Sequence, residues 1–249
     1  MIDGRTIGVV LDAMRLERAA LLTLLTDRGE AEWARPTECP AYTIKGVATH
    51  ILGDDLSLLS RQRDGAESGL LQLATTMPGS DFRTLLDTFN DRWVAAAQFL
   101  SPELLVELLR LTGDWTAAYY EGADPLAPGE PVGFFGAFGA SSPLWQSVAR
   151  EYVERWVHHS QIRRALGLGS LADDPFVAVG AGVVAAASGL PLGEPTTVEA
   201  AWLLGEVTFG PVGRTADLLT RAHDAATAQE LLSGPADQIE TLAPYVFRP

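Results

Sequence analysis

The stretch REYVERWVHHSQIRRALG, residues 150–167, decides which fold we expect. A Ser-Pro pair at 142–143 is a typical helix start and the final glycine is a typical stop, so a helix is predicted across 142–167. Glu154 and His158 are four residues apart and would lie on one face of it, at neighbouring turns. A carboxylate and a neutral imidazole are both good ligands for zinc or a similar divalent ion. The pair is therefore a candidate for part of a metal site.

A third ligand must come from another segment, and His50 is the obvious candidate among the four histidines of the chain. His223 falls in a predicted surface stretch, and a helical wheel places His159 nearer the centre of the apolar face than His158. Each part alone has a plainer interpretation. Glu154 and His158 could form a surface ion pair, and His50 could be a histidine packed in a helix.

Apolar residues recur with a helical period through most of the first 190 residues. Helix caps, and glycines that stand behind helix ends, are predicted at Thr6, Gly29, Thr43, Gly65, Ser80 and Ser101. The predicted helices cover residues 6–27, 43–63, 80–100 with a restart at 101, 142–167 and 174–189. Four long amphipathic helices with one long connection predict a mainly α fold, a helical bundle of the kind that builds metal sites between facing helices.

One long segment, residues 113–143, is rich in glycine, proline and aromatic residues. A connection of this length in a compact domain is usually a lid, a binding loop or flexible chain. The equal alternative is an irregular crossover whose aromatic side chains fill the core. The aromatics that would roof a pocket or fill the core are Trp115, Tyr119, Tyr120, Phe134, Phe135 and Phe138.

The last sixty residues change character, with an alternating stretch at 198–204 and a helical pattern near the end. We interpret residues 191–249 as a small α+β module that follows a helical bundle domain at 1–190. The stretch 216–232 can equally be read as one helix.

Composition excludes several classes of function. With 249 residues, 47% of them hydrophobic and 20% charged, the chain has the composition of a folded globular protein. A formal net charge of −14 without a basic cluster argues against a nucleic-acid partner, because such binding depends on clustered Lys and Arg. No signal-peptide pattern and no run of about eighteen apolar residues is found, so we expect no membrane partner and a cytoplasmic location. The single cysteine, Cys39, excludes an internal disulfide.

Two motifs carry a family resemblance, WARPTxCPxYxIxxVxxH at residues 33–50 and ExxxHxxxIRxALG at residues 154–167. Together they resemble the mycothiol-dependent maleylpyruvate isomerase family, over roughly residues 6–190. The resemblance implies a DinB-like metal-binding four-helix bundle, often followed by a small sterol-carrier-like α+β domain. It also implies a divalent metal, usually zinc, bound by His50, Glu154 and His158.

Two positions depart from the pattern of the relatives, which commonly carry Asp where this chain has Gln161 and often Trp where it has Tyr42. Metal ligands normally need hydrogen-bonded support, so Gln161 could change how the ligands are oriented. Arg155 and Arg163 are candidates to hold a carboxylate of a cofactor. An arginine on a helix rim is, however, ordinarily only solubilising.

Two further residues have both a functional and a plain interpretation. Cys39 could be a nucleophile of the protein itself, but a buried cysteine usually behaves as a small hydrophobic residue. Asp54, one turn after His50, could support that histidine as a base. The plainer interpretation of Asp54 is a solvated helix charge.

A three-ligand zinc site leaves a coordination position open. If a small thiol such as mycothiol binds there, zinc favours the thiolate, and we expect isomerisation of, or S-transfer to, a small electrophilic substrate. If water binds there, a thiol-independent hydrolase or cyclase is expected. A non-enzymatic small-molecule carrier is the third possibility, whereas a zinc-binding anti-sigma factor is disfavoured because paired cysteines are absent.

Overall fold

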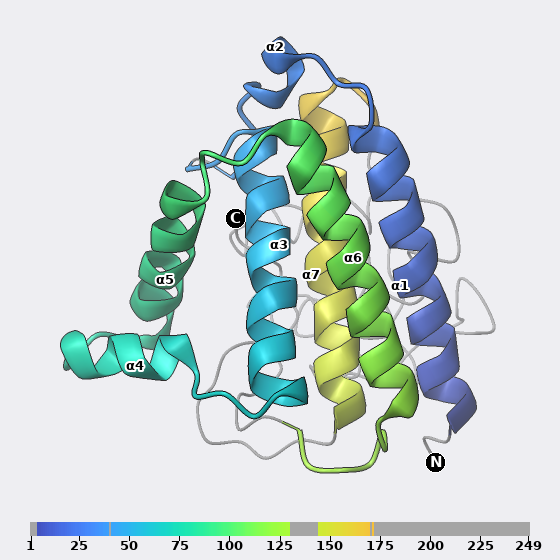
Figure 1. Cartoon of the computed structure of the whole chain (residues 1–249), viewed down its shortest axis with the longest axis vertical. Helices are drawn as coiled ribbons and strands as arrows, with labels where there is room; N and C mark the ends of the chain where they lie inside the picture. The colour runs from blue at the N-terminus through green and yellow to red at the C-terminus, as the bar shows by residue number, and fades with distance from the viewer. Residues whose placement is uncertain (1–3, 40, 130–143, 170, 172–249) are drawn as a thin grey trace, which may run out of the picture. The chain divides into compact units, whose positions relative to one another are not determined.

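A computed structural model describes residues 4–39, 41–129, 144–169 and 171 of the chain (Figure 1). Within these ranges there are seven α-helices, one π-helix and no named strand, which confirms the mainly α prediction for this part. No described helix combines the length and the hydropathy of a membrane span. Contacts divide the chain into two compact units, residues 18–147 and residues 1–17 with 148–249.

Several predictions fall outside the described residues. They are the helix at 174–189, the domain boundary after residue 190, the α+β module at 191–249, His223, and the aromatics Phe134, Phe135 and Phe138. All of these stay predictions.

The first helix, α1 (Gly4–Leu25), is followed by a residue in the left-handed conformation. Asp27 has φ 61°, which aspartate tolerates better than most residues because its short side chain can bond to the local backbone. Gly29 stands behind the helix end as predicted, and it caps the short helix α2 (Glu30–Trp33). The predicted N-cap at Thr6 is wrong, because α1 starts before it.

Helix α3 (Ile44–Leu58) begins as predicted, at an N-cap formed by Thr43. The Thr43 hydroxyl accepts a hydrogen bond from the Gly46 backbone N–H at 3.3 Å, which satisfies one of the first-turn donors. The predicted helix end is also correct, but the last turn is a π-helix, η1 (Leu59–Arg63), which the apolar period did not indicate. Gly65 then turns the chain with φ 71°.

Two helices follow before residue 101. Helix α4 (Gly69–Thr76) was not among the predicted helices. Helix α5 (Phe82–Ala96) is capped by Asp81 and not by Ser80, because the Asp81 carboxylate accepts from the Thr84 backbone N–H at 2.9 Å. The helix also ends before residue 100, so the predicted span is too long at both ends.

Helix α6 (Pro102–Gly122) starts as predicted, with the Ser101 hydroxyl accepting from the Leu104 backbone N–H at 3.2 Å. It continues past Gly113, so the predicted start of the long loop is wrong. A Cβ at Gly113 would lie 3.0 Å from side-chain atoms of Arg18. This glycine therefore makes room for a neighbouring side chain and does not stop the helix.

Three aromatics that were assigned to the loop lie on α6 instead. Tyr120 is buried, whereas Trp115 is exposed. The Tyr119 hydroxyl donates to the backbone oxygen of Gln62 at 3.1 Å, which ties α6 to the end of η1. Their positions match neither a roof over a pocket nor a single core cluster.

The last described helix, α7 (Leu144–Ala165), contains Glu154 and His158. Its predicted stop is confirmed, because Gly167 has φ 80° and its backbone N–H donates to the Arg164 oxygen at 2.9 Å. The helix has 22 residues, and α1 is equally long.

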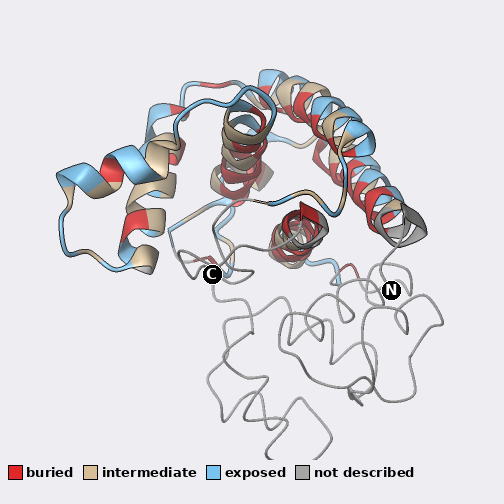
Figure 2. Ribbon diagram, turned by 90° about the horizontal axis from the view of Figure 1, so that it is seen from below, coloured by how far each residue is buried: buried red, intermediate tan, exposed pale blue. Residues whose placement is uncertain are grey.

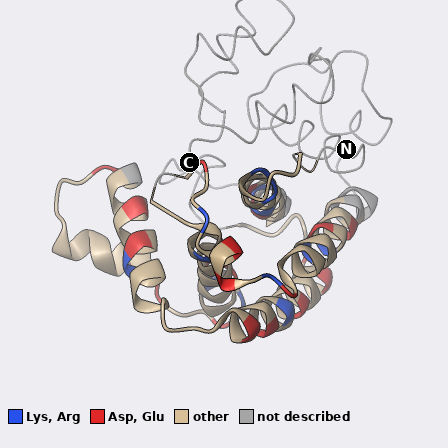
Figure 3. Ribbon diagram, turned by 90° about the horizontal axis from the view of Figure 1, so that it is seen from above, with Lys and Arg blue, Asp and Glu red and all other residues tan. Residues whose placement is uncertain are grey.

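In the unit of residues 18–147, α3 lies between α6 and α5, and α4 packs on α5 (Figure 1). Helix α4 buries Leu73 alone among its residues, as the colouring of Figure 2 shows. It also carries no charged residue, so it is uncoloured by charge in Figure 3. Helices α4 and α5 therefore form an outer layer on one flank of α3.

A buried ion pair holds the other flank of α3. Asp55, with no exposed surface, accepts from both terminal nitrogens of Arg18 at 2.8 Å and 3.2 Å. The Thr112 hydroxyl donates to the same carboxylate at 2.7 Å, and Arg18 also donates to the Leu109 backbone oxygen. The network connects α1, α3 and α6, because the three side chains come from these three helices.

Candidate functional site

His50 lies on α3, two turns after the Thr43 cap, and is 7% exposed. The ring of Tyr42 stacks against its imidazole, with ring centroids 6.1 Å apart and an interplanar angle of 27°. On the next turn of the helix, Asp54 places a carboxylate oxygen 3.9 Å from His50 Nε2. The imidazole is therefore covered by an aromatic ring and has a carboxylate nearby.

Tyr42 is held by a hydrogen bond that sequence reasoning did not find. Its hydroxyl donates to the Asp91 carboxylate at 2.8 Å, which connects the loop before α3 to α5. Burial, followed by the Asp91 hydrogen bond and charge, raises the pKa of Tyr42 well above its usual value. The phenol therefore stays protonated and acts as a donor that fixes the ring over His50.

Cys39 lies in the same loop and is 8% exposed. Its backbone N–H donates to the Thr37 hydroxyl at 3.2 Å, and its carbonyl accepts from the Tyr42 N–H at 3.0 Å. Burial raises the pKa of the Cys39 thiol. A protonated, covered thiol is a weak nucleophile, so the structure favours the plain interpretation of this residue.

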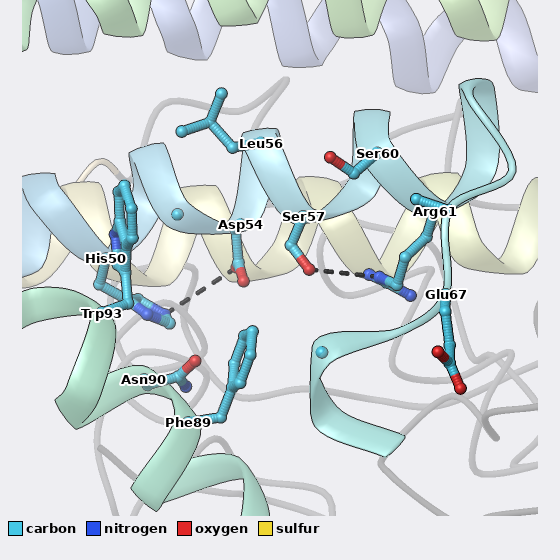
Figure 4. A pocket seen from close by; sticks show the side chains of 13 residues that line it. His50, Asp54, Leu56, Ser57, Ser60, Arg61, Glu67, Phe89, Asn90 and Trp93 are labelled. Atoms are coloured by element: carbon cyan, nitrogen blue, oxygen red, sulfur yellow. Dashed lines mark hydrogen bonds and ion pairs between the residues drawn. The ribbon is translucent and has the colours of Figure 1, made fainter. Parts of the chain in front are cut away.

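A pocket of about 300 Å³ opens beside His50, between α3, η1, α4 and α5. Figure 4 shows Asp54 and Ser57 directed from α3 into the pocket on the side of Phe89, with the Arg61 guanidinium of η1 beside the Ser57 hydroxyl. All of its lining residues belong to the unit of residues 18–147. The pocket was not predicted from the sequence, because α4 was not predicted.

On α7, His158 is almost completely buried and has a partner at each ring nitrogen. Its Nδ1 lies 2.9 Å from the side-chain oxygen of Gln161, and its Nε2 lies 3.6 Å from a carboxylate oxygen of Glu154. Because an amide oxygen can only accept, Nδ1 carries the hydrogen and the lone pair is on Nε2. Glu154 and His158 thus share one face of the helix, as the spacing predicts.

The protonation state of His158 also suits a metal ligand. Burial lowers the pKa of this histidine by more than the Gln161 hydrogen bond and the charge of Glu17 raise it, and the charge of Arg155 adds a smaller lowering effect. The neutral imidazole is the form that binds a metal. Gln161 therefore supplies the acceptor that orients the ring.

His159 has a different environment from His158. It is fully buried, and its Nδ1 lies 3.0 Å from a carboxylate oxygen of Glu17, which is also fully buried. Within the described residues, neither His159 Nε2 nor the second oxygen of Glu17 has a hydrogen-bond partner. The helical wheel correctly indicated that His159 is interior, but nothing in the sequence identified Glu17 as its partner.

The two arginines predicted to hold a cofactor carboxylate differ in their contacts. Arg155 is 3% exposed and donates to both the backbone and the carboxylate of Glu151, at 2.7 Å and 3.0 Å. Arg163 is less buried, and its Nε donates to the Gly169 backbone oxygen at 2.8 Å. Arg155 is therefore held inside its own helix, whereas Arg163 lies at the helix end.

The three predicted metal ligands belong to different units of the chain. His50 lies in the unit of residues 18–147, and Glu154 with His158 lies in the other. In the ranges that the structure covers, no three His, Cys, Asp or Glu side chains are grouped closely enough to hold a metal ion. The donor chemistry nevertheless fits a divalent metal, because His158 is neutral with its Nε2 lone pair beside a carboxylate.

Residues 14–163 match a protein-family model described as the mycothiol maleylpyruvate isomerase N-terminal domain. The matched range covers more than half of the chain and includes His50, Glu154 and His158. No curated protein and no solved structure matches the chain.

Proposed function

The chain belongs to the mycothiol maleylpyruvate isomerase N-terminal domain family, and from this membership we propose that it is a metal-dependent enzyme using a small thiol. The thiol is mycothiol, and the reaction is isomerisation of, or S-transfer to, a small electrophilic substrate. The observation that supports the proposal is the arrangement on α7, where Gln161 orients a neutral His158 whose Nε2 lies 3.6 Å from a carboxylate oxygen of Glu154. This is how a metal-binding histidine is prepared.

His50, Glu154 and His158 are the proposed ligands, and Zn²⁺ is the proposed metal. A bound zinc of this kind lowers the pKa of a thiol beside it, which makes the thiolate available as a nucleophile. Tyr42 keeps the His50 ring in place by stacking on it while its own hydroxyl is anchored on Asp91. The Tyr42 ring also covers one face of the His50 imidazole. His50 as a whole is only 7% exposed to solvent.

Arg163 is the better of the two proposed contacts for a cofactor carboxylate. Its terminal guanidinium nitrogens make no hydrogen bond to the residues that the structure covers, whereas Arg155 is paired with Glu151. A guanidinium can bind a carboxylate through two parallel hydrogen bonds.

Elemental analysis tests the metal. Protein purified without chelator and without an affinity metal is expected to contain about one zinc per chain. The variants His50→Ala, Glu154→Ala and His158→Ala are expected to lose it, whereas Glu107→Ala, on an exposed position of α6, retains it. A full metal content in all three ligand variants would reject the ligand set.

Turnover and calorimetry test the thiol. We expect maleylpyruvate or a related electrophile to be converted in the presence of mycothiol and not in thiol-free buffer. Zinc without mycothiol binding would reject the thiol half of the proposal. Conversion in thiol-free buffer would identify a metal-dependent hydrolase or cyclase, and ligand binding that survives loss of all three metal ligands would identify a carrier.

A further inference from the structure

Glu17 of α1 and His159 of α7 form a buried polar pair on helix faces that are otherwise hydrophobic. Glu17 Oε1 lies 3.0 Å from His159 Nδ1, and neither residue has any exposed surface. On α1, Glu17 stands at helical spacing among the buried residues Val10, Met14, Leu21 and Leu24. On α7, His159 stands in the same way among Val148, Tyr152 and Ile162. Each helix therefore carries one ionisable side chain within a buried hydrophobic stripe.

This pair is a poor source of stability. Burial removes the hydration of both side chains, and the contact between them restores only part of it. The other oxygen of Glu17 and Nε2 of His159 have no hydrogen-bond partner among the described residues. Hydrophobic residues of similar volume are often as stabilising as a buried pair, or more so. The pair therefore needs an explanation other than stability.

A single polar position in a hydrophobic helix contact can specify the register of the helices, at a cost in stability. If α7 slipped or rotated against α1, Glu17 and His159 would separate, and each would face buried hydrophobic side chains. A buried polar group without a partner is strongly disfavoured. Hydrophobic contacts are non-directional and oppose such a shift less. The contact thus selects one register and one rotation of α7.

The rotation of α7 decides where the proposed metal ligands point. His159 directly follows His158, and consecutive residues of a helix are about 100° apart around its axis. A helix that is held at His159 therefore also directs His158, and with it Glu154 one turn earlier. Gln161 orients the His158 ring on its own side chain. The pair with Glu17 would orient the helix that carries the ring.

We propose that Glu17 and His159 are positioning residues of the metal site. Their contact sets the register and rotation of α7, and α7 in turn directs the donor atoms of Glu154 and His158. Metal affinity depends on such supporting contacts as well as on the ligands themselves. This inference rests on the proposed function, because it concerns the same ligand set.

Two double variants of the full chain test the pair, Glu17→Leu with His159→Leu and Glu17→Met with His159→Phe. Both replace the polar contact by hydrophobic side chains of similar size. Urea unfolding of the metal-free protein is expected to show at least wild-type stability. Zinc affinity, measured by competition with a chromophoric chelator, is expected to fall about tenfold or more. The absorption bands of the cobalt-substituted protein should also change, because they report the geometry of the ligands.

Two single variants are the matched controls. Glu17→Gln removes the charge but keeps a group that can accept from, or donate to, His159 Nδ1, so zinc affinity should stay within about threefold of the wild type. Leu21→Ala leaves a cavity on the same face of α1 and keeps the pair. It should lower the free energy of unfolding and leave zinc affinity unchanged.

The outcomes separate this inference from the proposed function. Wild-type zinc affinity in the double variants would overturn the positioning role alone. An equal loss of affinity in Glu17→Gln would assign the effect to charge and would also overturn it. If both double variants are less stable than the wild type, or fail to fold, the pair is a stabilising contact and the inference is wrong. Absence of zinc from the wild type would reject the proposed function, and this inference with it.

Discussion

Two consecutive aspartates show how differently the two flanks of α3 are used. Asp55 faces α1 and α6, has no exposed surface, and accepts hydrogen bonds from Arg18 and Thr112. Asp54 faces the pocket, is about one third exposed, and lies 3.9 Å from His50. The same residue type is thus a structural anchor on one flank and part of a candidate binding surface on the other.

This contrast predicts that substitutions on the flank of Asp55 reduce the stability of the protein, whereas substitutions on the flank of Asp54 affect what binds in the pocket. On the inner flank, each removed partner leaves a charge or a polar atom buried without compensation, which is strongly destabilising. On the outer flank, water in the pocket can replace a lost partner. The expected losses of unfolding free energy therefore fall steeply from Asp55 to Asp54.

Asp55→Ala is expected to have the largest effect. It leaves the Arg18 guanidinium buried without its carboxylate, and loss of one partner of a buried pair costs about 3–5 kcal/mol. Urea unfolding followed by circular dichroism measures the loss. A loss below about 1 kcal/mol would mean that the two flanks do not differ as described.

Thr112→Val should come next. It replaces the hydroxyl by a methyl group of similar size and removes the 2.7 Å hydrogen bond to Asp55, a bond to a charged group that is worth about 1.5–3 kcal/mol. Thr112→Ser keeps the hydroxyl and should retain most of the stability. Equal unfolding free energies for the Val and Ser variants would argue against the hydrogen bond as the cause.

Gly53→Ala tests the close packing of α3 against Trp93 of α5. Alanine in a helix interior is normally about 1 kcal/mol better than glycine, but here the added Cβ would clash with Trp93, so we expect a net loss of about 1–2 kcal/mol. Gly8→Ala, in α1 where a Cβ meets nothing within 4 Å, is the matched control and should be neutral or stabilising. The same unfolding measurement compares the two variants.

Asp54→Ala should have the smallest effect on stability, within about 0.5 kcal/mol of the wild type, because the side chain is partly solvated and its histidine is 3.9 Å away. If this variant unfolded as readily as Asp55→Ala, the assignment of α3's outer flank to binding would be wrong.

Helix boundaries were predictable where the signal is local. The caps at Thr43 and Ser101 are hydrogen bonds to a backbone N–H three residues away, so the sequence carries them directly. The sequence wrongly indicated a helix end at Gly113. Glycine stands there because the side chain of Arg18, which is far away in the chain, lies against it. Helix α4 was missed because it is short and buries a single residue, which gives a weak apolar period.

The same distinction between local and distant contacts explains which parts of the candidate site could be predicted. Glu154 and His158 lie one turn apart on one helix, so spacing alone predicts that they share a face. The sequence indicated that Gln161 could affect the orientation of the ligands, but not that its side-chain oxygen would lie 2.9 Å from His158 Nδ1. The stacking of Tyr42, its hydrogen bond to an aspartate on α5, and the pairing of His159 with Glu17 all join segments far apart in the chain. Periodicity describes one element at a time and could not have found these contacts.

Gly53 and Gly69, which lie against Trp93 and Phe89, can be used to compare this chain with other sequences. Because any side chain at Gly53 or Gly69 would push an aromatic ring away, a relative with a larger residue at either position must arrange this corner differently. Glycine at both alignment columns should therefore mark the family members that share the cavity. In an alignment, the cavity would therefore be recognised by these two glycines and not by any polar residue.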